Sequence, residues 1–247
     1  MKIKIHESLV ILLLISLFVG LFNKLLIIYL IVIMHELGHI IACYFYKRKV
    51  DKITLIPLGG IIEFENDKNT SLKEELIIIL SGPLINLFIF IICMLFNISN
   101  DLSHFNKLIL LINLLPIYPL DGGRILEIAL MRIFSFKKSL YITSLISILF
   151  IIIIGLYSIL EGVSLSIIFV LLYLLYKNLH SLRYIKERYH SFLTKKYLYP
   201  NPNLKNYFIK YYKKNIYQYF HKGVNNNLGD KEKYKNEDFL LKRYFQK

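Results

Sequence analysis

Long apolar segments separated by short polar connections most restrict what this chain can fold into. The six segments are 8–22, 25–45, 76–96, 108–120, 140–160 and 163–176. A helix needs about 20 apolar residues to cross the hydrocarbon core of a bilayer, and the second, third and fifth segments meet that length. Hydrophobic residues make up 55% of the chain and charged residues only 19%, which leaves too little polar surface for a water-soluble enzyme. The sequence therefore predicts an all-α polytopic membrane protein with six transmembrane helices.

The fourth apolar segment, 108–120, is interrupted by residues that a regular helix does not favour. Asn113, Pro116 and Pro119 lie within it, and a proline removes a backbone donor and clashes with the preceding turn. Non-helical backbone at membrane depth is tolerated only where protein shields it or where it lines a wet cavity. We therefore expect a broken fourth span.

Between the second and third segments, residues 53–64 form a shorter apolar stretch of a different kind. It is rich in β-branched residues and is divided by Gly59 and Gly60, a pattern typical of two strands joined by a turn. The sequence predicts a short re-entrant, β-hairpin-like loop at the membrane interface.

Basic residues gather at alternate ends of the apolar segments and in the C-terminal part of the chain. Residues 177–247 carry 17 Lys/Arg against 5 Asp/Glu, which is +12 of the net charge of +14. Because Lys and Arg accumulate on the cytoplasmic side of membrane proteins, this distribution predicts that both termini are cytoplasmic. The basic excess directly follows the last apolar segment, which favours contact with the lipid bilayer and no binding of nucleic acid. We expect a six-span domain at 1–180 and a basic cytoplasmic extension at 181–247.

The motif His35-Glu36-Leu37-Gly38-His39 lies in the middle of the second apolar segment. On a helix, His35 and His39 are one turn apart on the same face, where both imidazoles can bind one metal ion. Glu36 beside them can act as a general base and take a proton from an attacking water. Two histidines and a carboxylate are costly in hydrocarbon and therefore indicate function. Histidines hydrogen-bonded between helices are the alternative.

A third metal ligand is expected, because catalytic zinc commonly takes three protein ligands and keeps one position open for water. Asp121 follows the broken fourth segment and can reach a depth similar to that of the histidines. Gly122 and Gly123 allow the backbone to turn sharply next to it. We predict that Asp121 completes the site for one zinc ion per chain, and an interfacial turn is the alternative interpretation of Asp-Gly-Gly.

Together these motifs resemble those of the site-2 proteases, zinc metalloproteases that cut substrates within or near the membrane. The family pattern is HExxH followed at a distance by LDG, and the second motif is present as Leu120-Asp121-Gly122. Ser81-Gly82-Pro83-Leu84-Ile85-Asn86 matches the small-Gly-Pro-x-x-Asn element of the intervening span. The resemblance covers residues 25–135, and the compact layout is most similar to the stage IV sporulation FB-type subgroup, which processes pro-sigma-K.

This resemblance implies an intramembrane zinc metalloendopeptidase that processes a membrane-associated, pro-sigma-K-like factor during sporulation. The substrate would present an extended segment near the membrane, and membrane-protein inhibitors would block the site until it is needed. Asn86, Asn113 and Pro119 would shape the substrate path, although Asn113 and Pro119 are equally explained as helix-breaking residues. The subgroup usually ends in a nucleotide-binding CBS domain, and the extension at 181–247 is too short for a complete one.

Besides an inactive scaffold, against which the complete ligand set argues, two other functions remain open on the sequence. The first is a site-2-type protease that acts on another substrate, such as an anti-sigma factor. The second is a non-proteolytic transporter that binds a passing metal ion with His35, His39 and Asp121. A carrier has no need of Glu36 and usually shows internal repeats, which this sequence lacks, so a protease is favoured.

Overall fold

The chain folds into two compact units, Met1–Asn66 with Leu76–Leu115, and Asp67–Glu75 with Pro116–Lys247. The structure is a computed structural model that describes residues 2–5, 7–48, 50–56, 59–64, 71–98, 100–162, 165–200, 203–209, 219–229 and 234–245. Most of the described residues are helical, as expected for a chain with long apolar segments.

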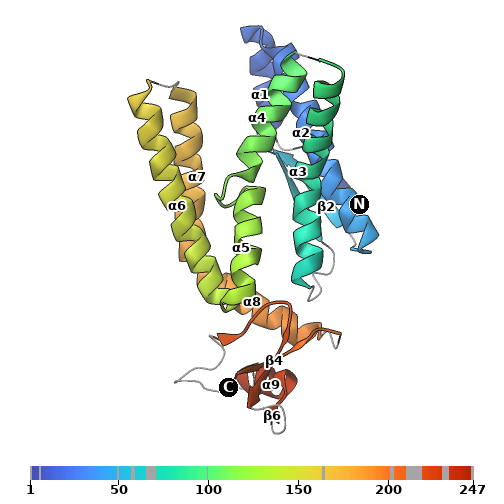
Figure 1. The fold of residues 1–247 in the computed structure, drawn as a ribbon, viewed down its shortest axis with the longest axis vertical. Coiled ribbons are helices and arrows are strands. Elements are labelled where there is room, and N and C mark those ends of the chain that lie inside the picture. Colours follow the sequence, from blue (N-terminus) through green and yellow to red (C-terminus); the bar gives the residue numbers. More distant parts are fainter. Residues whose placement is uncertain are drawn as a thin grey trace. The chain divides into compact units, whose positions relative to one another are not determined.

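The first unit is built from helices α1 to α4 and a small sheet (Figure 1). The helices are α1 (Glu7–Val19), α2 (Phe22–Phe45), α3 (Leu72–Leu95, whose first turn belongs to the second unit) and α4 (Asp101–Leu114). Helix α2 packs against both α1 and α4. Asn100 caps α4, because its side-chain oxygen accepts a hydrogen bond from the backbone N–H of Ser103.

The sheet of the first unit contains the predicted hairpin and one strand that was not predicted. Strands β2 (Val50–Ile56) and β3 (Gly59–Phe64) pair antiparallel, which confirms a hairpin in this part of the chain. Strand β1 (Lys2–Ile5) adds to β2 in parallel. The all-α prediction is therefore incomplete, because short runs of alternating residues pair as strands outside the long apolar helices. The re-entrant position of the hairpin stays a prediction.

Three of the described helices, α2, α3 and α6 (Phe136–Leu160), are long and apolar enough to cross a membrane. Large apolar side chains on all three face outward, for example Leu30 at 54%, Phe88 at 62% and Leu156 at 59% exposure. Extended apolar surface of this kind suits contact with lipid and would be a liability in water. The six spans predicted from the sequence stay a prediction.

The second unit begins where the fourth apolar segment is interrupted. Helix α4 ends at Leu114 and helix α5 (Asp121–Ile133) begins at Asp121, with a non-helical connection that contains a cis peptide bond before Pro119. Helix α6 packs against α5 and against α7 (Leu165–Arg183). Buried serine and threonine side chains line α6 at Ser139, Thr143, Ser144, Ser147 and Ser158. The broken fourth span stays a prediction.

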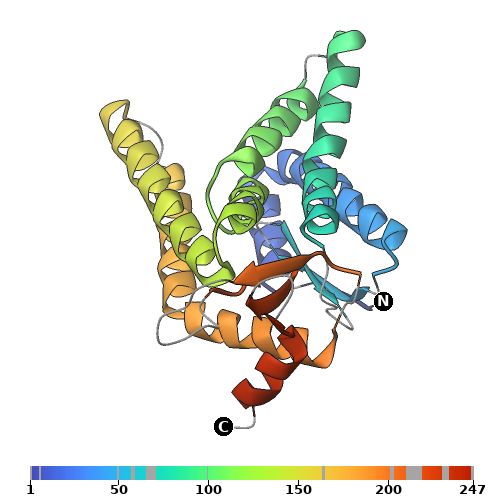
Figure 2. The same ribbon diagram turned by 60° about the horizontal axis from the view of Figure 1, so that its bottom comes forward.

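The part of the second unit that follows α7 is a small folded module. This C-terminal module consists of α8 (Ile185–Leu198), β4 (Asn206–Ile209), β5 (Asn225–Gly229), β6 (Tyr234–Lys235) and α9 (Glu237–Phe245). Strand β5 pairs in parallel with β4 and antiparallel with β6, and α9 lies beside both α8 and β5 (Figure 2). Its buried core continues into α5 and α6 through Met131, Phe136 and Leu140. The basic extension is thus a packed structure over its described residues.

Candidate metal centre

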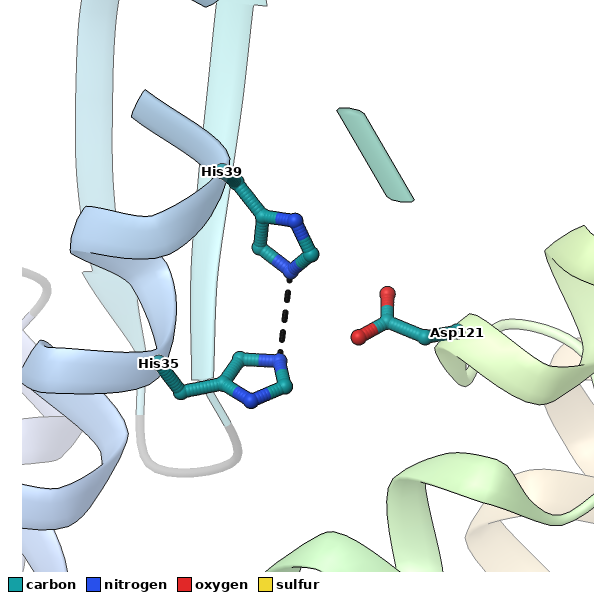
Figure 3. Close-up of side chains that lie close together, drawn as sticks. All are labelled: His35, His39 and Asp121. Atoms are coloured by element: carbon teal, nitrogen blue, oxygen red, sulfur yellow. Dashed lines mark hydrogen bonds between the residues drawn. The ribbon is translucent and has the colours of Figure 1, made fainter. Parts of the chain in front are cut away.

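Two histidines of α2 face each other inside the first unit. His35 and His39 are 4% and 9% exposed, and both lie on the face of α2 that carries its buried residues. Their Nε2 atoms are 3.2 Å apart, and the two rings meet almost at right angles, with an interplanar angle of 81° (Figure 3). The predicted one-turn spacing therefore brings the two imidazoles together.

The distance between these two nitrogens fits a shared metal ion. Two nitrogens bound tetrahedrally at ~2.0–2.1 Å from zinc are separated by ~3.3–3.4 Å. The observed 3.2 Å lies close to that value. The same distance allows one N–H···N hydrogen bond when no metal is bound, so the pair has a stable arrangement in either state.

The orientation of the His39 ring is fixed by a hydrogen bond to the neighbouring helix. Nδ1 of His39 donates to the backbone carbonyl of Ile78 on α3, at 2.8 Å. The hydroxyl of Ser81 donates to the same carbonyl. With the proton on Nδ1, Nε2 keeps its lone pair for a metal, as is common for histidine ligands held from behind by a carbonyl.

Two glycines allow α2 and α3 to approach closely at this point. A Cβ on Gly38 would lie 2.8 Å from Cγ1 of Ile85 and 2.5 Å from the carbonyl oxygen of Ser81. A Cβ on Gly82 would lie 2.7 Å from Nε2 of His35 and closer still to Nε2 of His39. The space in front of the two Nε2 atoms therefore exists because residue 82 has no side chain. Two imidazole nitrogens and a carboxylate are a donor set that fits a metal ion.

Asp121 is the first residue of α5, in the second unit (Figure 3). It is 9% exposed, so its carboxylate is largely removed from water. A Cβ on Gly123 would lie 2.6 Å from the carbonyl oxygen of Ile117. Because Gly123 has no side chain, the first turn of α5 can pack directly on the backbone of the preceding connection. This agrees with the turn predicted from Gly122 and Gly123.

The connection before Asp121 is held by polar groups of two long helices. The backbone N–H of Tyr118 donates to Oγ of Ser147 on α6, at 2.9 Å. The carbonyl of Tyr118 accepts a hydrogen bond from Nδ2 of Asn178 on α7. Ser147 is 0% exposed and Asn178 is 0% exposed. Sequence reasoning missed both residues, because Ser147 is one of several hydroxyl residues in its apolar segment and Asn178 lies just beyond the sixth apolar segment.

The other predicted site residues lie on different elements of the fold. Glu36 follows His35 on α2 and is half-buried. Asn86 on α3 is 0% exposed, and its side-chain amide has no hydrogen-bond partner among the described residues. The backbone carbonyl of Asn86 accepts a hydrogen bond from Nδ2 of Asn106 on α4. Asn113 is half-buried near the end of α4, and Pro119 lies in the connection before α5. A buried amide without partners needs an explanation, and binding another chain is one.

The chain matches known proteins over the segment that carries these residues. Residues 23–102 match Peptidase family M50. The chain is 37% identical over 147 residues to the stage IV sporulation protein FB of Bacillus subtilis, covering 56% of this chain and 51% of that protein. It is 34% identical over 119 residues to a zinc metalloprotease of Methanocaldococcus jannaschii, covering 44% and 34% of the two chains. The chain thus spans about half or less of the length of these curated relatives.

A solved structure also resembles the fold. The site-2 protease from Methanocaldococcus jannaschii aligns with a TM-score of 0.57 and 26% sequence identity. The match covers 72% of this chain and 89% of that one. The resemblance inferred from the motifs is therefore confirmed by comparisons of both sequence and fold.

Proposed function

We propose that this chain, whose residues 23–102 match Peptidase family M50, is an intramembrane zinc metalloendopeptidase of the site-2 protease type. One observation carries the proposal. Nε2 of His35 and Nε2 of His39 lie 3.2 Å apart on a helix long and apolar enough to cross a membrane. Buried imidazoles in such a helix are costly, so their mutual orientation is best explained by a metal site.

The zinc ligands in this proposal are His35, His39 and Asp121, for one zinc ion per chain. All three side chains are buried and each offers one ligand atom. Two imidazoles and one carboxylate are a donor set that catalytic zinc uses, with a fourth position left for water or substrate. Support for Asp121 comes from its burial at the start of α5 and from its place in the Leu120-Asp121-Gly122 motif.

The chemistry is divided between the metal and Glu36. When bound, zinc polarises the scissile carbonyl and makes a water molecule more acidic. Glu36 accepts the proton of the attacking water and passes it to the nitrogen of the leaving amine, so that the proton is conserved through the cycle. The substrate must be extended where it is cut, because the carbonyls of a helix are occupied by hydrogen bonds.

In this proposal the membrane domain comprises residues 1–180 and has six spans, of which the fourth is the interrupted segment 108–120. Both termini lie in the cytoplasm, and residues 181–247 form the cytoplasmic extension. The concentration of Lys and Arg in the C-terminal part of the chain supports this orientation.

The proposed substrate is a membrane-associated pro-sigma factor processed during sporulation. The similarity to the stage IV sporulation protein FB of Bacillus subtilis supports this class of substrate. Asn86, whose buried side-chain amide has no hydrogen-bond partner in the described part of the chain, would bind the backbone of the extended segment. Asn113 and Pro119 would lie further along its path. Membrane-protein inhibitors would cover the site until cleavage is needed. An anti-sigma factor is the second substrate to test.

Co-expression distinguishes the two substrates. The chain is produced with a candidate pro-sigma factor, or with a membrane-anchored anti-sigma factor, and each is followed by its size on a gel. The proposal expects the pro-sigma factor to be shortened by the wild-type chain and to stay intact with His35→Ala. Cleavage of the anti-sigma factor alone would show that the proposed substrate is wrong, while the proposed protease activity would still hold.

A further inference from the structure

We infer that Arg188 of the C-terminal module is a positioning residue for Asp121, because its guanidinium holds the chain on both sides of that carboxylate. The inference rests on the proposed role of Asp121 as a metal ligand. Every contact that carries it lies within the second unit.

Arg188 makes three kinds of contact, each with a different element. Its Nη2 donates to both carboxylate oxygens of Glu127 on α5, at 3.0 and 3.2 Å. Its Nη1 donates to Oγ of Ser181 on α7, at 3.2 Å. Its Cζ lies 5.2 Å from the centre of the Tyr118 ring, in the connection between α4 and α5. One planar group therefore joins α8 to three other parts of the unit.

Two of these contacts bracket Asp121 along the chain. Tyr118 comes three residues before Asp121, and Glu127 comes six residues after it on the same rigid helix, about 9 Å further along. The backbone of Tyr118 is already held by Ser147 and Asn178. Arg188 adds contacts with the Tyr118 ring and with Glu127 in the middle of α5. The start of α5 is therefore restrained on both sides of Asp121.

The contact with Glu127 is more than an ordinary surface ion pair. Exposed pairs contribute little, because water screens the charges and two long side chains must be ordered. Here the side chain of Glu127 is 13% exposed and that of Arg188 is 30% exposed. A guanidinium presents donors on separate nitrogens of one planar group, so it can bond a carboxylate and a hydroxyl while lying over a ring, whereas an ammonium offers a single nitrogen. The geometry therefore suits arginine better than lysine.

The C-terminal module fixes Arg188 in turn. Helix α8 is anchored beside Arg188 by Tyr189 and Phe192, whose rings pack on Phe136 at the start of α6. The backbone N–H of Phe136 also donates to the carbonyl of Phe220, at 3.0 Å. The packing of the module therefore fixes the position of α8 and, through Arg188, the position of α5.

The test uses full-length protein in detergent with three substitutions. Arg188→Gln removes both the charge and the planar guanidinium, and Arg188→Lys keeps the charge alone. Arg183→Gln is the control, since Arg183 is an exposed arginine at the end of α7. Zinc affinity is measured by competition with a chelator. Backbone hydrogen exchange is measured over 116–127, and kcat and KM are determined with a short peptide.

Arg188→Gln is expected to weaken zinc binding roughly 10-fold or more, as removal of a group that orients a ligand commonly does. Exchange over 116–127 should rise, and kcat should fall while KM stays near the wild-type value. Arg188→Lys should show smaller changes in the same direction, and Arg183→Gln should show none. In an Asp121→Asn background, Arg188→Gln should not weaken zinc binding further, because the two residues act through one ligand.

Three results would overturn the inference. The first is wild-type exchange over 116–127 in Arg188→Gln. The second is faster exchange spread over the whole C-terminal module, which would indicate a general loss of structure. The third is full additivity with Asp121→Asn. Hydrogen exchange needs no metal, so it tests the positioning role even if the wild-type chain binds no zinc. In that case the proposed function fails, and the exchange over 116–127 alone decides the inference.

Discussion

The Nε2 atom of His35 lies 3.2 Å from the Nε2 atom of His39, close to the separation of two nitrogens bound to one tetrahedral zinc ion. This separation follows from the one-turn spacing on α2 and from the hydrogen bond that fixes the His39 ring on the carbonyl of Ile78. It also depends on Gly82, where any side chain would fill the space in front of both nitrogens.

Gly82→Ala should abolish zinc binding. The added methyl group would lie 2.7 Å from Nε2 of His35 and would force the imidazoles apart. Alanine normally stabilises a helix relative to glycine by ~1 kcal/mol, so helix propensity cannot explain a loss. Metal content is measured on purified protein. The control is Gly155→Ala on α6, where the nearest atom would be Cδ1 of Leu171 at 3.9 Å, an ordinary contact. Equal zinc content in both variants would contradict the proposed position of the metal.

Asp121→Asn should lower zinc affinity roughly 10-fold or more, because a neutral amide oxygen is a weaker ligand than a carboxylate. Chelator competition measures the change. Asp101→Asn is the matched control, since Asp101 is an exposed acid at the start of α4. If the Asp121 variant binds zinc as tightly as the wild type, the third ligand must be another residue.

Lys196→Met should destabilise the C-terminal module. The ammonium of Lys196 is 1% exposed and lies 2.8 Å from both carboxylate oxygens of Glu237, so the substitution leaves a buried carboxylate without its cation. Losing one partner of a buried pair costs ~3–5 kcal/mol. Hydrogen exchange over 185–245 reports the loss. Lys186→Met, at an exposed position of α8, should change little. Adding Glu237→Gln should recover part of the loss, and failure to do so would argue against the pair.

The stability of the C-terminal module should decrease below pH ~6.5, the usual pKa of histidine. Burial lowers the pKa of His221, and the charge of Lys196 acts in the same direction, while a hydrogen bond with the backbone of Met131 opposes them. The unfolded chain therefore takes up a proton that the folded chain resists, so stability is complete above that pH and is lost as the pH falls towards the lowered pKa. Hydrogen exchange at pH ~7.5 and ~5.5 measures this. His221→Asn should reduce the pH dependence, and an unchanged dependence would assign it to other groups.

The sequence predicted the features that depend on local pattern. The one-turn spacing of His35 and His39 led directly to the facing imidazoles. Long apolar runs predicted α2, α3 and α6, and the glycine-divided stretch predicted the hairpin of β2 and β3. These features arise within one helix or between neighbouring strands, so hydropathy and spacing are sufficient to find them.

The remaining features depend on residues that are distant in the sequence. Nothing near Tyr118 in the sequence indicates that Ser147 and Asn178 hold its backbone. The C-terminal module was likewise hidden, because its strands are short and rich in Lys, Tyr and Asn, which hydropathy assigns to solvent. Its core forms only when apolar residues of α8 and α9 meet Met131 and Phe136. Such contacts are products of the tertiary fold and leave no periodic pattern.

Cleavage by Glu36→Gln at matched zinc content is the most direct test of the central claim. Glutamine keeps the size of the side chain and cannot accept the proton of the attacking water, and Glu36 is not one of the proposed ligands. Purified wild-type and variant proteins are analysed for zinc and incubated with the uncleaved substrate identified by co-expression. The account predicts the same zinc content in both proteins, with cleavage by the wild type and none by the variant. Continued cleavage by a zinc-loaded Glu36→Gln protein would contradict it.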